Sequence, residues 1–69
     1  MRYSSAHELG PGDVGRRVTV RRRLPDGGLG DVIGVLESID DDTAVLLDRR
    51  GARIRIELAD VTASRVVGE

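Results

Sequence analysis

The sequence VIGVLESIDDDTAVLLDRRGARIRIEL, at residues 32–58, decides the fold. Apolar and polar residues alternate through much of it, which is the pattern of strands with one face buried. Two breaks divide it, the acidic run at residues 40–42 and the pair Arg50 and Gly51, and both contain residue types that favour turns. The stretch therefore predicts three consecutive strands at 32–39, 43–49 and 52–58.

The register of the strand at 32–39 depends on Gly34. A glycine inside a strand often marks a bend or a bulge, where a small barrel turns a corner. Leu36 and Ile39 fall on opposite faces of a regular strand, and a bulge near Gly34 would let both reach the core. The register around Gly34 is therefore left open.

Upstream of this stretch, residues 17–24 predict a further strand. Val18 and Val20 alternate with polar residues, so the valines point inward and Arg17, Arg21 and Arg23 point outward. Residues 25–28, PDGG, are a strong turn signal, because proline and glycine supply the backbone angles that turns need. We expect the connection to continue to residue 31, as in the long first loop of an SH3-like barrel.

Downstream, residues 58–61 predict a one-turn helical connector, and residues 63–67 a short last strand. The expected fold is all-β, a small five-stranded SH3-like barrel with a short helical turn before the last strand. Sm-like barrels are a weaker alternative, since they begin with a helix and form rings. Residues 1–15 are a lead-in segment, in which Val14 is a candidate plug under the barrel, and residues 16–69 are the barrel domain.

The chain is short, and its stability must come from apolar packing. It has 69 residues and no cysteine, and its hydrophobic residues are almost all aliphatic. Such a domain retains roughly 3–5 kcal/mol of net stability. The inward positions of the five strands predict a core made of Val18, Val20, Leu36, Val45, Leu47, Ile54, Ile56 and Val66.

Composition excludes several classes of function. The single histidine, His7, is the only conceivable base for a serine nucleophile, and it lies in the lead-in segment, so no catalytic residue is assigned. Asp40, Asp41 and Asp42 lack the ligand spacing of a calcium loop, so no metal site and no cofactor are expected. The single aromatic residue, Tyr3, cannot form a polyproline groove or a methyl-lysine cage. No apolar run is long enough to span a membrane, and we expect a cytoplasmic protein.

The arginines of the strand at 17–24 are the candidate binding residues. Arg17, Arg21 and Arg23 share one face and are a candidate contact for a polyanion or a protein partner. The net charge of the chain is −1, and several aspartates offset the arginines, so a solvated face is the simpler interpretation.

Two motifs give the chain a family resemblance. The sequences DVGRRV at residues 13–18 and LADVTASRV at residues 58–66 resemble the N-terminal SH3-like domain of actinobacterial GNAT-family N-acetyltransferases. The resemblance extends over about residues 9–67. It implies a noncatalytic accessory domain that acts through protein or interdomain contact, with an acetyltransferase catalytic domain or another protein as partner.

The residues that would bind acetyl-CoA in that family have no counterpart here. Residues 49–53 lack the second small residue of the family's pyrophosphate loop, and a strand follows instead of a helix. We therefore expect no enzyme activity from this chain. A stand-alone nucleic-acid-binding barrel that uses the arginine-rich strand is the alternative function, and the oligomeric state is left open.

Overall fold

The structure is a computed structural model, which describes residues 4–5 and 9–67. Within these residues the chain forms short strands and two single-turn 3-10 helices. In chain order they are β1 (Ser4–Ser5), η1 (Pro11–Asp13), β2 (Arg17–Arg23), β3 (Leu29–Ile39), β4 (Thr43–Leu47), β5 (Arg53–Glu57), η2 (Leu58–Asp60) and β6 (Val61–Val66).

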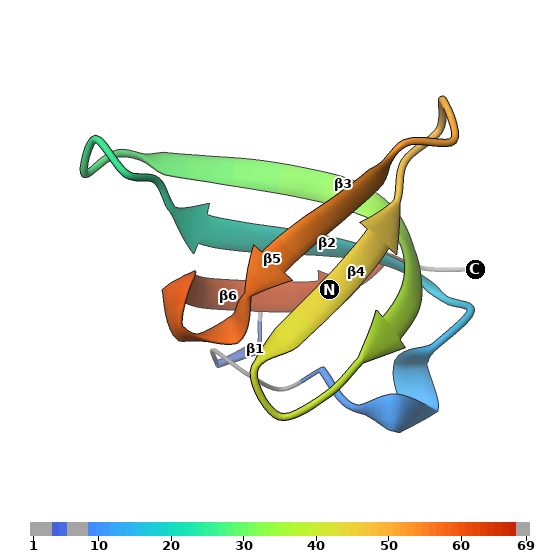
Figure 1. Cartoon of the computed structure of the whole chain (residues 1–69). Helices are drawn as coiled ribbons and strands as arrows, with labels where there is room; N and C mark the ends of the chain where they lie inside the picture. Colours follow the sequence, from blue (N-terminus) through green and yellow to red (C-terminus); the bar gives the residue numbers. More distant parts are fainter. Residues whose placement is uncertain (1–3, 6–8, 68–69) are drawn as a thin grey trace.

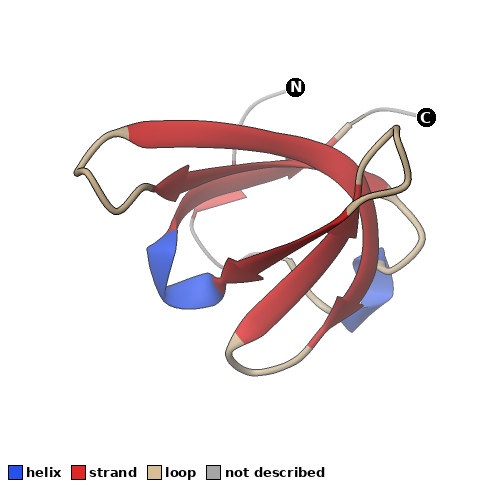
Figure 2. Cartoon of the chain, turned by 45° about the horizontal axis from the view of Figure 1, so that its top comes forward, coloured by secondary structure: helices blue, strands red, loops and turns tan. Residues whose placement is uncertain are grey.

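All strands belong to one antiparallel sheet with the order β1-β6-β2-β3-β4-β5. Figure 1 shows that the sheet is strongly bent, so that β4 and β5 cross in front of β2 and β6. The short helix η2 carries the chain from β5 back to β6, and Figure 2 shows the same curved sheet from a second direction. The predicted all-β, small-barrel fold and its helical turn before the last strand are confirmed.

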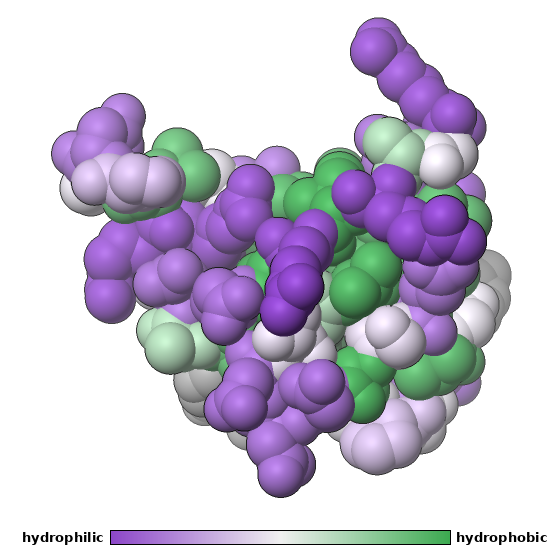
Figure 3. All heavy atoms as spheres, viewed as in Figure 1, coloured by the Kyte–Doolittle hydropathy of each residue, from purple (hydrophilic) through white to green (hydrophobic). Residues whose placement is uncertain are grey.

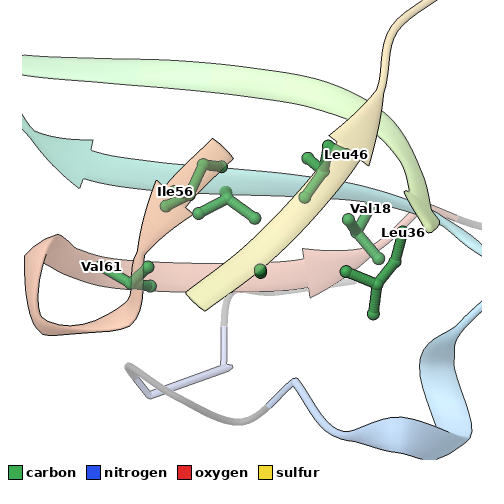
Figure 4. Close-up of a cluster of buried hydrophobic side chains, with 7 residues drawn as sticks. Val18, Leu36, Leu46, Ile56 and Val61 are labelled. Carbon is green, nitrogen blue, oxygen red and sulfur yellow. The ribbon is translucent and has the colours of Figure 1, made fainter. Parts of the chain in front are cut away.

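The core lies inside the bend of the sheet and draws on every strand from β2 to β6. Figure 4 shows Val18, Leu36, Leu46, Ile56 and Val61 pointing toward one another. Of these, the first four are fully buried and Val61 is nearly so. Val20 and Ala44 complete the buried set, and Ile54 and Val66 are half-buried against it.

The predicted face of β4 is wrong: Ala44 and Leu46 are buried, whereas Val45 and Leu47 lie on the outer side and are only half-buried. The cause is the pairing with β3, where Leu36 is directly opposite Leu46. Residues that face each other across antiparallel strands point to the same side of the sheet, so an inward Leu36 requires an inward Leu46.

The bulge in β3 lies at Glu37 and not at Gly34. Leu36 pairs with Leu46 and Ser38 with Val45, which leaves Glu37 as the extra residue. The consequence expected of a bulge is confirmed, because Leu36 is buried and Ile39 packs against the same core.

Gly34 instead allows β3 to lie close to the end of β4. It pairs regularly with Val18. A Cβ atom at Gly34 would lie 2.7 Å from the carbonyl oxygen of Leu47, a distance that real Cβ atoms do not adopt. Because the neighbouring atom belongs to the backbone, a side chain here would push the two strands apart.

The connection between β2 and β3 is shorter than predicted, because β3 begins at Leu29 and not at residue 32. The amide of Leu24 donates a hydrogen bond to the carbonyl of Gly28 (2.8 Å), and the amide of Gly27 donates one to the carbonyl of Leu24 (2.9 Å). Gly27 has a φ of 90°, which glycine adopts without strain. The turn therefore closes within residues 25–28, and Gly30 joins the ladder opposite Arg22.

The predicted lead-in segment contributes to the sheet and to the core. Ser4 and Ser5 pair with Ser64 and Ala63 of β6. Val14 is not a plug, since 46% of it is exposed, and Leu9 packs against the core instead. His7 lies outside the described residues, and the domain boundary at residue 16 stays a prediction. Among the described residues, no helix is long and apolar enough to cross a membrane.

Candidate functional site

The three candidate arginines occupy alternate positions on β2 but do not form a uniform site. Arg17 and Arg23 are exposed. Arg21 is half-buried, and its Nε donates to Oδ1 of Asp31 at 2.9 Å. This hydrogen bond to the Arg21 guanidinium lowers the pKa of the Asp31 carboxyl below its ordinary value. Arg21 therefore has a carboxylate partner within the fold.

Arg22 lies on the opposite side of β2 from these three arginines. It shares the inward parity of Val18 and Val20, and its Nη1 donates to the carbonyl oxygen of Arg55 at 3.5 Å. The three arginines at residues 21–23 therefore lie on both sides of the strand, as alternation predicts, and the side chain of Arg22 contacts β5.

A hollow of about 380 Å³ lies on the outer side of the sheet, beside the turn between β4 and β5. Three consecutive strands supply one row of residues there, in which Arg17 pairs with Val35 and Val35 pairs with Leu47. We call this feature the β3–β4 hollow. Its lining residues are Arg17, Ile33, Gly34, Val35, Leu47, Asp48, Arg49 and Arg50.

The arginines of the β3–β4 hollow differ from Arg53 and Arg55 of the outer face, which have carboxylate partners. Arg53 binds Glu37 at 2.7 Å, and Arg55 lies 3.8 Å from Glu57. Within the described part of the chain, the side chains of Arg17, Arg49 and Arg50 have neither an ion pair nor a hydrogen bond.

Asp48 is the one acidic residue of the hollow, and its carboxylate is used to fix the turn. Its Oδ1 accepts hydrogen bonds from the amides of Arg50 (2.8 Å) and Ala52 (2.9 Å). Gly51 completes the turn with a φ of 88°. The backbone that carries Arg49 and Arg50 is therefore held by local hydrogen bonds.

The acidic run between β3 and β4 forms a turn. Oδ1 of Asp40 accepts hydrogen bonds from the amides of Asp42 and Thr43, both at 2.8 Å. These two backbone hydrogen bonds lower the pKa of the Asp40 carboxyl. No group of residues suited to holding a metal ion occurs in the regions that the structure covers.

Hydrophobic side chains are exposed in one region of the surface. Figure 3 shows polar side chains over most of one face, with hydrophobic ones between the two projecting hairpin tips. Leu29 and Ile33, on the outer side of β3, are 58% and 54% exposed. Because alternation within β4 predicts Leu47 as a core residue, the sequence pattern does not bring Ile33, Leu47, Arg49 and Arg50 together in one site. The pairing of Leu36 with Leu46 was the missing information.

Residues 12–65 match the family described as the Rv0428c N-terminal Sm-like domain. The chain belongs to this family. No curated protein and no solved structure matches it.

The Sm-like domain as matched contains every residue that lines the β3–β4 hollow. The match supports a small β-barrel domain and identifies no catalytic family. It also favours the Sm-like type of barrel over the SH3-like type, although an Sm-like barrel is expected to begin with a helix. Among the described residues before β2, the only helical element is η1, a single 3-10 turn.

Proposed function

We propose that this Sm-like domain is a noncatalytic accessory module that binds a protein partner, an acetyltransferase catalytic domain. The observation that carries the proposal is the exposed aliphatic surface on the outer side of β3. Leu29 and Ile33 are more than half exposed, and Val35 and Leu47 continue this surface toward β4. Exposed apolar surface with a charged rim is typical of protein contact sites.

Two further observations support the choice of partner. The family description places the domain at the N-terminus of the protein Rv0428c. The motifs at residues 13–18 and 58–66 resemble the N-terminal module of GNAT-family acetyltransferases. A module of this kind contributes contact surface, while the catalytic residues and the acetyl-CoA site belong to the other domain.

Isothermal titration calorimetry of the chain with a GNAT-family catalytic domain from the same genome tests the proposal. We expect saturable binding that Ile33→Glu weakens by tenfold or more, because a charge would be buried at the centre of the contact. Val14→Glu is the matched control, since Val14 is also an exposed aliphatic residue but precedes β2. The isolated chain should show no saturable binding of acetyl-CoA. An undetectable interaction with the catalytic domain, or micromolar binding of acetyl-CoA, would contradict the proposal.

Nucleic-acid binding is the second candidate, and the exposure of Arg17 and Arg23 favours it. If these arginines contacted phosphates, affinity for a short duplex would fall with salt at a log-log slope of about 0.9 per contact. Because Arg21 is already paired with Asp31, we expect no measurable binding at physiological salt. Tight binding that is lost on combining Arg21→Glu with Arg23→Glu, while the fold persists, would select this candidate.

A further inference from the structure

We infer that the β3–β4 hollow binds a short acidic peptide segment of the partner, one that carries an aliphatic side chain between its carboxylates. This inference rests on the proposed function, because it names the chemistry of the partner surface. Three features of the hollow carry it. Its floor is the aliphatic set Ile33, Val35 and Leu47, and its rim is the set Arg17, Arg49 and Arg50, whose side chains have no partner among the described residues. The backbone that carries two of these arginines is held by hydrogen bonds.

The floor accepts an aliphatic side chain. Val35 and Leu47 lie side by side across β3 and β4, and Ile33, at 54% exposed, adds a third aliphatic group. Gly34 cannot carry a side chain, because a Cβ atom would meet the Leu47 carbonyl. The volume of about 380 Å³ suits one side chain and a short piece of backbone.

The rim accepts carboxylates. Three arginines and one aspartate line the hollow, which leaves a formal charge of plus two. Within the described residues Arg17, Arg49 and Arg50 have no side-chain partner, whereas Arg21, Arg53 and Arg55 each have a carboxylate within 4 Å. A guanidinium has a planar set of donors that matches a carboxylate, so these arginines are suited to bind acidic side chains.

The turn below the rim reduces the cost of binding. Asp48 accepts hydrogen bonds from the amides of Arg50 and Ala52, and these contacts hold the backbone of the β4–β5 turn. A site whose backbone is already ordered loses less entropy when it binds a ligand.

An acidic peptide fits this hollow better than nucleic acid does. Apart from Gly34, the uncharged residues that line the hollow are aliphatic, and the described lining has no aromatic side chain on which a base could stack. The arginines also share the hollow with aliphatic side chains, whereas a single-strand site has a positively charged groove that follows the phosphate backbone.

The test is a ¹⁵N NMR titration of the full chain with a synthetic peptide in which glutamates flank a single leucine. We expect shifts concentrated at residues 33–35 and 47–51, and none with a peptide in which lysines replace the glutamates. Combining Arg49→Glu with Arg50→Glu should weaken the peptide at least about tenfold, because two attractive charges become repulsive. Arg23→Glu is the matched control, an exposed arginine of β2 outside the hollow, and should change the affinity less than twofold.

Three results would overturn the inference: no shifts at millimolar peptide, an equal loss of affinity with Arg23→Glu, or the same shifts with a short DNA duplex at physiological salt. Binding measurements with the catalytic domain distinguish a failure of this inference from a failure of the proposed function. If that domain binds and the Arg49 and Arg50 changes leave its affinity unaltered, the hollow is not the site, although the proposed function stands. If it does not bind while the acidic peptide does, the proposed function fails and the site stands.

Discussion

Two adjacent leucines of β4 have opposite environments. Leu46 is fully buried between Leu36 and Ile54 of the neighbouring strands, whereas Leu47 is half-buried on the outer side. Two consecutive leucines therefore have different roles. Leu46 packs in the core, and Leu47 forms part of the floor of the β3–β4 hollow.

This difference gives a matched pair of substitutions. We expect Leu46→Ala to cost about 2–5 kcal/mol, because it removes buried methyl groups and leaves a cavity. That loss is comparable to the whole stability of a domain of this size, roughly 3–5 kcal/mol, so the variant should be largely unfolded. Leu47→Ala should unfold cooperatively at a denaturant midpoint closer to wild type. Urea denaturation followed by circular dichroism measures both, and a larger loss for Leu47→Ala would show that the faces of β4 are reversed.

At the level of single elements, the extra residue in β3 determines which face the end of the strand presents. Because Glu37 has no directly opposite partner on β4, Leu36 and Ile39 both face inward. The side chain of Glu37 contributes separately, through its ion pair with Arg53 at 2.7 Å. Hydrogen bonding and charge attraction from Glu37 raise the pKa of Arg53.

Deletion of residue 37 separates these two contributions. Removing it should turn either Leu36 or Ile39 outward, since a one-residue shift exchanges the faces of a strand. We expect the deletion variant to lose its cooperative thermal transition. The substitution Glu37→Ala keeps the residue count and removes an exposed ion pair, so it should change the free energy of unfolding little. A deletion variant as stable as Glu37→Ala would show that the bulge has no role.

The turn between β3 and β4 links stability to pH through Asp40. Amide donors from Asp42 and Thr43 lower its folded pKa below the ordinary value of 3.8. The ionised carboxylate therefore favours the folded state above the unfolded pKa, and this contribution is lost as pH falls from about 4 through the folded pKa.

The corresponding variant is Asp40→Asn, which keeps an oxygen acceptor but cannot titrate. We expect its free energy of unfolding to fall less than that of wild type between about pH 5 and pH 2, because this carboxylate supplies part of the acid sensitivity. Urea denaturation at each pH measures the difference. Asp41→Asn is the control for the loss of a charge in the same turn. Parallel pH profiles for wild type and Asp40→Asn would contradict the assignment.

The strand positions were largely predictable from sequence, and the faces of one strand were not. Val18 and Val20 alternate with polar residues, so local pattern alone determines their direction. Residues 44–47 are all apolar, so their sequence pattern does not show which of them face the core. The pairing with β3 determines which residues face inward. The β3–β4 hollow was missed for the same reason: its residues come from three strands and a turn, and only the register brings them together.

At the scale of the whole molecule, β6 and β1 contribute very unequally to the sheet. β6 pairs with β2 along five positions, including buried Val18 and Val20, and supplies Val61 to the core. β1 adds two pairs at the outer edge of β6. Leu9, which follows β1, packs against the core.

Truncation from each end tests this inequality. A chain that begins at Leu9 should keep a cooperative transition, because it retains the contacts of Leu9 and of every strand from β2 to β6. A chain that ends at Asp60 should not fold, because Val18 and Val20 lose the strand that covers one side of them. Differential scanning calorimetry distinguishes the two. A cooperative transition in the chain ending at Asp60 would show that the sheet from β2 to β5 folds alone.

Because β2 pairs with β6, the sheet can be completed only after β6 has been synthesised. Each hairpin from β2 to β5 joins neighbours in the chain, but the pair of Val18 with Val66 closes a long loop. The strands from β2 to β5 are synthesised before β6. Until β6 has emerged, the nascent chain exposes one edge of β2 and part of its apolar interior. Because closure of distant contacts slows folding, we expect the docking of β6 to be the late step and the interval of greatest risk for aggregation.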